Sequence, residues 1–475
     1  MSSLITPVEH GRTGGLPAWL AHLASSAANW PTAYRARLQE RPRRTVLLSA
    51  LVVLVFAYPL LNRAVLQPFS RNVFPLPAPD DTTVVFMLIF ATMAIGLNIV
   101  IGFAGLLDLG YVAFYALGAY SAAYLASPHW SGVSILLFSD LPAGFPGIHL
   151  PFFIIFWAAA LVAALFGALL GAPTLRLRGD YLAIVTLGFG EIVPVFFKNL
   201  VNVHFSFGPI QLVNANLTGG PLGINPIDAP ELFGIKFGVI HGFNAVYLAL
   251  AVVAMSIVIA RNLERSRMGR AWMAIREDET AAEMMGVNTV RTKLLAFGLG
   301  ASFAGFAGAM QASYQGATTS DFFMFATSIL VVIMIILGGI GNIWGVILGA
   351  ITVQYVDKTL LGWVGNRLKD TGVAIGSPQL GEINPSQFSF LLLGLALVLM
   401  MRFRPEGLLP SRQRAAELHA APPDQALGSA AVMEIEEEVI EEAEPEDVDA
   451  TTDPPPEPGA ASGPPDTPGR PGGGT

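Results

Sequence analysis

The sequence predicts an all-α polytopic membrane protein with about ten transmembrane or part-spanning helices, some of them broken by glycine. Hydrophobic residues make up 53% of the 475 residues and charged residues only 13%, whereas an ordinary soluble domain carries about 25% charged residues. Several uninterrupted apolar runs reach the roughly 20 residues that a helix needs to cross a bilayer. Because backbone polar groups in lipid must be satisfied internally, only helices or closed barrels can span it. These runs are too long and continuous for barrel strands.

In chain order, the apolar runs predict spans at 45–66, 83–102, 111–127, 150–172, 181–200, 243–261, 293–313, 323–339, 341–357 and 387–403. Glycines interrupt two stretches, "GLNIVIGFAGLLDLGYVAFYALGAY" (Gly96–Tyr120) and "ILGGIGNIWGVILGAI" (Ile336–Ile351). Interrupted segments often surround the substrate path of a transporter, but for any single glycine close helix packing is the plainer interpretation. In "FAGFAGA" (Phe303–Ala309) the small residues predict packing alone.

The distribution of Lys and Arg predicts the orientation of the spans. With the N-terminus inside, 19 basic residues fall on the inner side and seven on the outer side or at outer helix ends. Because inner loops carry the excess of basic residues, both termini and the 261–293 connection are predicted to be cytoplasmic. The connections 128–149, 201–242 and 358–386 are then predicted to face outward.

The predicted organisation is a cytoplasmic N-terminal extension (1–44), a transmembrane domain (45–403) and a cytoplasmic tail (404–475). The extension shows no short apolar core followed by a cleavage site, so no cleaved signal peptide is expected, and the first span is expected to act as the insertion signal. Residues 416–475 hold fifteen acidic residues and one basic residue. Such a composition with many prolines and glycines predicts disorder from about 416; an acidic docking tail for a basic partner is the alternative.

Several kinds of chemistry are excluded or disfavoured. The chain has no cysteine, no G-x-x-x-x-G-K-[S/T] phosphate loop and no H-E-x-x-H pair, and its seven histidines are scattered. It therefore cannot cradle ATP in a phosphate loop of its own, and a metal site is not expected. We predict that the protein is not an enzyme and has no catalytic residue, no resident cofactor and no nucleic-acid partner.

A few residues inside the predicted spans are candidates for a translocation path, because ionisable groups there are costly and usually functional. Asp108 lies in the glycine-broken "GLLDLGY", near the inner membrane face, and Glu191 lies mid-span in "TLGFGEIV". The candidate path comprises Asp108, Gly110, Thr186, Gly188, Gly190 and Glu191. For Glu191 a helix–helix hydrogen bond remains the plainer alternative.

Between two spans lies the charged stretch "ERSRMGRAWMAIREDETAAEMMGVNTVRTK" (Glu264–Lys293). It predicts a short amphipathic helix, with Gly286 ending the helix and Asn288 capping the next one. Asp278 falls on the apolar side and makes the pattern imperfect. The apolar face is predicted to hold Ala271, Ala274, Ile275, Ala282 and Met285, and a second stripe to hold Arg276, Glu279 and Glu283 with Trp272 among them. We interpret it as a docking helix for a cytosolic protein; a membrane-surface helix without a partner is the alternative.

A resemblance to a known family is carried by several motifs. "AAEMMG" (Ala281–Gly286) resembles the Ala-Ala-x-x-x-Gly core by which ABC permeases dock on their ATPases, although Thr280 stands where Glu is usual and Glu279 comes one residue earlier. The others are "GLLDLGYVAFYALGAY" (Gly105–Tyr120), "LRLRGDYLAIVTLGFGEIV" (Leu175–Val193), "TGGPLGI" (Thr218–Ile224), "GRAWMAIREDE" (Gly269–Glu279) and "RPEGLLP" (Arg404–Pro410). Together, over roughly 80–412, they look like the branched-chain amino-acid ABC permeases, closest to the M-type (LivM-type) subunit.

The resemblance implies a multi-pass permease of a bacterial inner-membrane importer. Its expected partners are a homologous H-type permease, two cytosolic ABC ATPase subunits, a periplasmic amino-acid-binding protein and the lipid bilayer. Related permeases carry urea or amides, so the preferred substrate stays open. The ATPase-coupling loop would contain Arg270, Trp272, Arg276, Glu279, Ala281, Ala282 and Gly286.

Two hypotheses compete with the importer. One is a self-sufficient secondary carrier that uses Asp108 and Glu191. The other, an intramembrane enzyme, lacks a clustered nucleophile and base.

Overall fold

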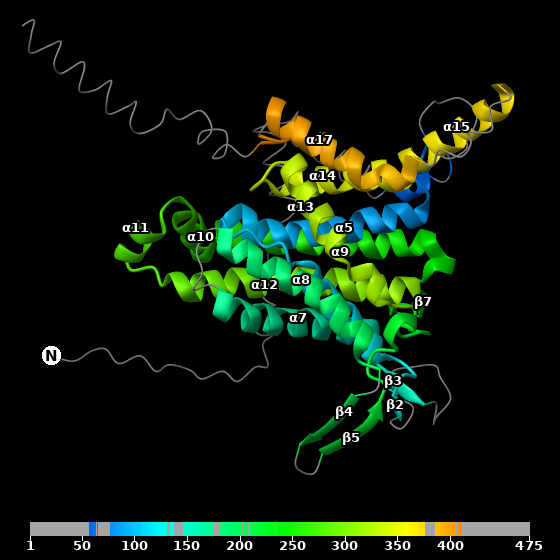
Figure 1. The fold of residues 1–475 in the computed structure, drawn as a ribbon, viewed down its shortest axis with the longest axis horizontal. Coiled ribbons are helices and arrows are strands. Elements are labelled where there is room, and N and C mark those ends of the chain that lie inside the picture. Colours follow the sequence, from blue (N-terminus) through cyan, green and yellow to red (C-terminus); the bar gives the residue numbers. More distant parts are fainter. Residues whose placement is uncertain are drawn as a thin grey trace, which may run out of the picture. The chain divides into compact units, whose positions relative to one another are not determined.

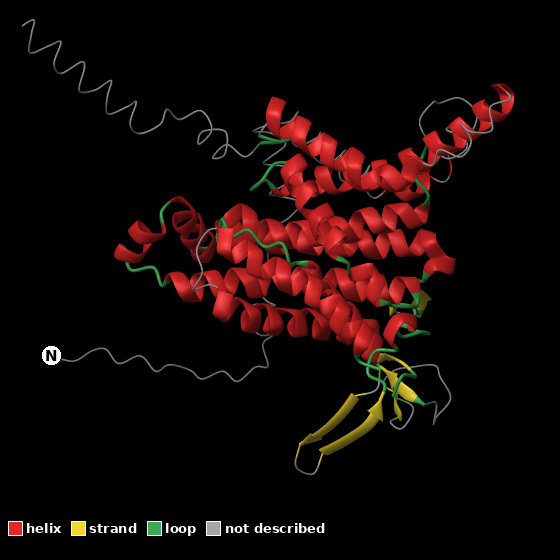
Figure 2. Cartoon of the chain, in the orientation of Figure 1, coloured by secondary structure: helices red, strands yellow, loops and turns green. Residues whose placement is uncertain are grey.

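A computed structural model describes residues 57–62, 64, 77–130, 134–136, 146–174, 180–201, 203–207, 210–232, 234–375, 385–404 and 406–410. Within these ranges the chain is mostly helical, and its short strands gather at one end of the helices (Figure 2). The helical membrane fold predicted from the sequence is therefore confirmed. The predicted N-terminal extension and acidic tail lie outside the described residues, as does most of the first predicted span, 45–66.

Six of the predicted spans are present as helices long and apolar enough to cross a membrane. They are α5 (Asp81–Asn98) with its π-helical continuation η2 (Ile99–Phe103), α7 (Phe152–Thr174), α8 (Asp180–Asn199), α9 (Gly242–Arg265), α12 (Thr289–Gln315), and α17 (Ser389–Phe403) with the preceding turn η7 (Pro385–Phe388). Figure 1 shows these helices running side by side.

The three spans crowded by glycine are shorter helices. They are α6 (Val112–Leu125), α13 (Phe325–Gly338) and α14 (Ile343–Tyr355). The last one continues through the π-helix η6 (Val356–Leu360) into α15 (Leu361–Ile375). The predicted outward loop 358–386 is thus helical as far as Ile375, which the search for apolar runs missed because α15 carries Arg367, Lys369 and Asp370.

The connections at one end of the helices contain strands that the sequence did not predict. A three-stranded sheet has the order β1 (Ala126–Ser127), β3 (Gly147–His149), β2 (Ser134–Leu136), and two antiparallel pairs join β4 (Val203–Phe207) to β5 (Ile210–Ala215) and β6 (Glu231–Leu232) to β7 (Ile235–Lys236). Three 3-10 turns accompany them: η3 (Gly220–Leu222), η4 (Val239–His241) and η5 (Ser320–Phe323). We call this the strand end.

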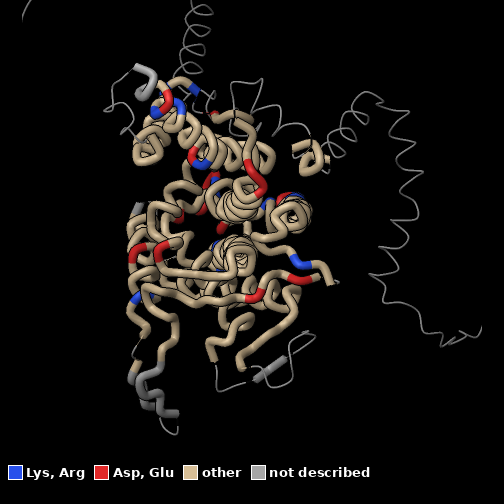
Figure 3. The backbone as a smooth tube through the Cα atoms, turned by 90° about the vertical axis from the view of Figure 1, so that its right-hand side faces the viewer, with Lys and Arg blue, Asp and Glu red and all other residues tan. Residues whose placement is uncertain are grey.

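Two short helices lie at the opposite end, α10 (Arg267–Glu277) and α11 (Glu279–Met284) (Figure 1). We call this the α10–α11 end. Figure 3 looks along the helices from the strand end and shows that charged positions are sparse among them. The few charges that do lie along a helix therefore stand out as candidates for function.

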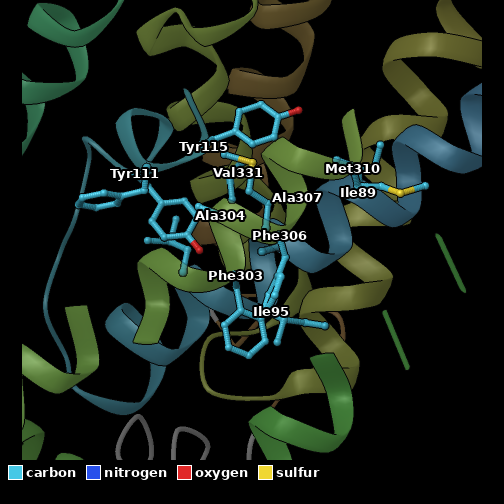
Figure 4. Close-up of a cluster of buried hydrophobic side chains, with 14 of the residues drawn as sticks. Ile89, Ile95, Tyr111, Tyr115, Phe303, Ala304, Phe306, Ala307, Met310 and Val331 are labelled. Carbon is cyan, nitrogen blue, oxygen red and sulfur yellow. The ribbon is translucent and has the colours of Figure 1, made fainter. Parts of the chain in front are cut away.

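Helix α12 is the centre of the core and packs against α5, α6 and α7. Small residues make this approach close: a Cβ added at Gly305 would lie 2.7 Å from the carbonyl oxygen of Ala159. The predicted packing role of "FAGFAGA" is thus confirmed. Around it, aromatic rings of α6 and α12 fill the interior, among them Tyr115, Phe303 and Phe306 (Figure 4).

The two glycine-broken stretches meet at the α10–α11 end. Asn98, which is fully buried, accepts a hydrogen bond through Oδ1 from the backbone N of Gly341 (2.9 Å). A Cβ added at Gly102 would lie 2.9 Å from that same nitrogen. The break between α5 and α6 and the break between α13 and α14 are therefore in direct contact.

The "RPEGLLP" segment after α17 lies on the second of these breaks. The backbone N of Leu408 donates to Leu337 O (2.8 Å), and that of Leu409 donates to Gly338 O (3.0 Å). The Nδ2 of Asn342 returns a hydrogen bond to Leu409 O (3.0 Å). These bonds satisfy carbonyls that the end of α13 would otherwise leave without a partner.

Candidate functional site

The charged 264–293 connection forms two helices and not the single amphipathic helix that we predicted. Ser266 caps α10, and its Oγ accepts from the backbone N of Gly269 (3.1 Å). Asp278 then adopts an extended backbone, and its Oδ1 accepts from the backbone N of Thr280 (2.8 Å) and of Ala281 (3.0 Å). The residue that spoiled the amphipathic pattern is therefore the N-cap of α11, because a short acidic side chain there satisfies free helix N–H groups.

Two side chains anchor this pair of helices to the start of α12. Trp272 is fully buried, and its Nε1 donates to Thr292 O (2.8 Å). Glu279 of α11 pairs with Lys293 Nζ at 2.6 Å. Trp272 is therefore part of the fold's interior and not of a charged outer stripe, which corrects its predicted placement.

The Ala-Ala-x-x-x-Gly core divides between the two sides of α11. Ala282 is only 5% exposed and faces the protein, whereas Ala281 is exposed together with Met284 and Met285. Met285, predicted on the same helical face as Ala282, is instead 85% exposed, because the break at Asp278 turns α11 out of the register of α10. Short α11 thus presents a small apolar surface away from the bundle.

Gly286 ends this pair of helices as predicted, with a left-handed backbone at φ +86° that glycine adopts without strain. Asn288 caps α12, as predicted, by accepting from the backbone N of Arg291 (2.9 Å). Arg270 is exposed on α10, and its Nη1 donates to Arg265 O (3.1 Å).

Arg276 connects α10 to the first glycine break. Its Nη1 donates to Gly102 O (2.7 Å), and a Cβ added at Gly105 would lie 2.7 Å from its Cγ. Because Gly102 also abuts Gly341, a displacement of α10 would reach both breaks through one side chain.

Four of the six candidate path residues, Asp108, Gly110, Thr186 and Gly190, pack against one another where this break meets α8. Asp108 is 1% exposed, and its Oδ1 accepts from Gly110 N (2.9 Å). The backbone N of Leu109, between these two residues, donates to Thr186 Oγ1 on α8 (3.1 Å). A Cβ on Gly110 would lie 2.0 Å from Thr186 O, and one on Gly190 would lie 3.2 Å from Gly110 Cα. The turn therefore fits tightly on α8.

Beside this contact the structure leaves a cavity of about 10 Å³, lined by Asp108, Gly110, Thr186 and neighbouring apolar side chains. That is room for about one water molecule. In this conformation the cluster is closed, and an amino acid could not pass between its members.

The other two candidates, Gly188 and Glu191, lie on a different face of α8. Glu191 is exposed and shares a helical stripe with Val195 and Lys198, because residues three and four apart are neighbours on a helix. This stripe lines a groove of about 740 Å³, whose other walls come from η5, α13 and α17. Among the described residues, Glu191 forms no hydrogen bond or ion pair.

Sequence reasoning missed two parts of this arrangement. One is the docking of "RPEGLLP" on the second break. Its apolar Gly-Leu-Leu core indicates a buried segment, but the local sequence does not show which distant helix end the segment pairs with. Lys198 and Asp321, which also line the groove, were not among the predicted path residues, because nothing in the chain order brings α8 beside η5.

Comparison with known proteins places these features in a family. The profile of the family described as "Branched-chain amino acid transport system / permease component" matches residues 81–401. The permease LivM of Salmonella typhimurium is 36% identical over 389 residues, covering 78% of this chain and 75% of its own length, and LivM of Escherichia coli matches equally. LivH of Salmonella typhimurium is 25% identical over 284 residues, covering 59% of this chain and 84% of its own. No solved structure matches the chain.

Proposed function

The chain belongs to the family of branched-chain amino acid transport permease components, and we propose that it is the M-type permease subunit of an ATP-driven importer in a bacterial inner membrane. The observation that carries this proposal is the family match over 81–401, which covers the helices from α5 to α17. The cargo would be a branched-chain (hydrophobic) amino acid such as leucine. Separate ATPase subunits would supply the energy.

The docking surface for an ATPase would be the outward side of α11. Ala281, Met284 and Met285 are exposed there, and flexible methionines with a small alanine suit a shallow fit into a cleft. Trp272 and the Glu279–Lys293 pair hold the surface firmly on α12. A displacement of α11 would therefore also displace α10 and α12.

The force would reach the membrane through Arg276 and the two glycine breaks. Gly110 and Asp108 lie in the first break, just before α6, and the break packs against Thr186 of α8. We propose this closed contact as the inner gate, and the Glu191 stripe of α8 as the wall of the path. Glycine-broken helices are where transporters commonly place such movements.

The remaining partners would meet the chain at the groove beside α8 and at the strand end. A homologous H-type permease would cover the groove beside Glu191, since a charged side chain on an outer helix face is costly against lipid. LivH, a relative that also resembles this chain, illustrates such a second permease. A periplasmic binding protein would deliver substrate at the strand end, with both termini of the chain on the cytoplasmic side.

The test is reconstitution in proteoliposomes. We expect leucine uptake only when the chain is combined with the second permease, the ATPases, the binding protein and ATP. Uptake by the purified chain alone, driven by an imposed proton or sodium gradient, would instead establish the secondary carrier. That outcome is not favoured by the structure, because Asp108 is enclosed while Glu191 faces the groove.

A further inference from the structure

The groove beside α8 has an apolar floor and a charged mouth at the strand end. Its apolar lining includes Phe325, Ile329 and Ile333 of α13 and Leu397 of α17. Its polar lining consists of Glu191 and Lys198 of α8 with Ser320 and Asp321 of η5. At about 740 Å³ it falls within the range of small-molecule sites, roughly 300–1,000 Å³.

The polar groups at the mouth are without partners in the described part of the chain. Ser320 is 2% exposed, and its Oγ has no hydrogen-bond partner among the described residues. Neither Lys198 nor Asp321, both exposed, forms an ion pair with any described side chain. A buried hydroxyl left unpaired costs about 1–3 kcal/mol, so the site favours an occupant that can bond it.

Packing beneath the mouth joins the two elements that carry Lys198 and Asp321. Tyr120 stacks on Phe197, which adjoins Lys198, with ring centroids 4.0 Å apart, and it also contacts Phe323 of η5 at 5.9 Å. These rings are buried. A charged pair held apart on a rigid frame is pre-organised for a ligand instead of collapsing on itself.

The "TGGPLGI" segment holds the same two elements from the outside. The hydroxyl of Thr218 donates to Phe197 O at the end of α8 (2.6 Å). Ile224 pairs with Thr318, just before η5, through backbone bonds of 2.9 and 3.1 Å. The "TGGPLGI" motif therefore joins the end of α8 to the residues before η5 and holds Lys198 beside η5.

We propose that this mouth is a binding station for the zwitterionic head of an α-amino acid on its way along the path. Lys198 pairs with the carboxylate, and Asp321 together with the Ser320 hydroxyl accepts hydrogen bonds from the ammonium group. The branched side chain lies on Phe325 and Ile329. Glu191, seven residues before Lys198 and about 10 Å further along the helix, is the next acceptor for the ammonium group as the substrate moves inward.

This inference rests on the proposed function and adds to it the residues that recognise the cargo within the permease. A zwitterionic phospholipid could place a phosphate and an amine on the same pair of charges. We assign the amino acid, because the groove has the volume of a small-molecule site and Ser320 lines it. The lipid is retained as an outcome of the experiment.

The experiment uses the membrane complex of the two permeases and the ATPases in lipid nanodiscs, without binding protein. The probe is a leucine analogue with a diazirine in its side chain. We expect light to attach the analogue to the peptide that contains Phe325 and Ile329. Leucine should compete, whereas leucinamide, which lacks the carboxylate, and 4-methylpentanoate, which lacks the amine, should compete about tenfold or more weakly. The loss of one charge-assisted hydrogen bond corresponds to that factor.

Lys198→Gln and Asp321→Asn should each weaken labelling about tenfold or more. The matched controls Lys236→Gln on β7 and Asp370→Asn on α15, both exposed and outside the groove, should label as the wild type does. Assembly of every variant with its partners is checked by size-exclusion chromatography. A variant that fails to assemble is replaced by Lys198→Arg or Asp321→Glu, which should retain labelling.

Unchanged labelling of Lys198→Gln and Asp321→Asn would overturn the inference, as would attachment elsewhere or competition by phosphatidylethanolamine alone. ATP-driven leucine uptake is measured on the wild-type importer in parallel. Normal uptake with unaffected variants rejects the binding station only, whereas absent uptake in the wild type rejects the proposed function.

Discussion

Replacing Arg276 with alanine tests whether α10 transmits movement to the helices. The substitution removes the 2.7 Å hydrogen bond from Nη1 to Gly102 O and the packing of the Arg276 stem on Gly105. A hydrogen bond from a charged donor contributes about 1.5–3 kcal/mol. Since Arg276 is only half-buried, we take the lower value, about 1.5 kcal/mol. If this bond links ATPase movement to the gate, its loss should weaken the coupling about tenfold.

The assay measures leucine transported per ATP hydrolysed in proteoliposomes. We expect Arg276→Ala to retain ATPase binding and hydrolysis while transport per ATP falls about tenfold. Arg291→Ala is the matched control: this arginine is exposed in the first turn of α12, so its loss should change stability by no more than about 0.5 kcal/mol. An Arg276→Ala importer with wild-type transport per ATP would refute the transmission through Gly102. Loss of ATPase binding would instead place Arg276 in the docking surface.

Three further predictions concern the gate, the docking surface and the path. Gly110→Ala should destabilise the permease by about 1–3 kcal/mol, because its Cβ would lie 2.0 Å from Thr186 O. Gly188→Ala is the control: Gly188 has open space around it, so the substitution should be neutral or stabilise α8 by up to about 1 kcal/mol. Thermal unfolding in detergent measures both. Ala281→Arg should abolish co-purification of the ATPase while pairing with the second permease survives; retained ATPase binding would contradict a docking role for exposed α11. Glu191→Gln should lower uptake while ATPase assembly persists, and unchanged uptake would show that its charge does not shape the path.

The structure also changes which alanine is informative. The sequence marks Ala281 and Ala282 equally, but Ala282 is buried against the protein. A bulky charge there would disturb the fold of α11 before it met any partner, since a buried unpaired charge is strongly destabilising. Only the substitution at Ala281 separates a docking defect from a folding defect.

The sequence alone determined the helical membrane fold, most span positions and the family of transport proteins to which the chain belongs. These follow from local information: a run of about 20 apolar residues must be a helix in lipid whatever surrounds it. The positions of Gly286 and Asn288 at a helix end and a helix start were equally local, because glycine conformation and capping depend on the nearest few residues.

Contacts between distant segments were decided only by the tertiary structure. Trp272 lies inside because α12 supplies the carbonyl of Thr292, and α11 turns outward because Asp278 caps it. The six path candidates, adjacent in two motifs, separate into a closed contact at Gly110 and an open groove at Glu191. Which face of α8 is covered depends on its neighbours, and periodicity gives the faces of a helix without naming what packs on each of them.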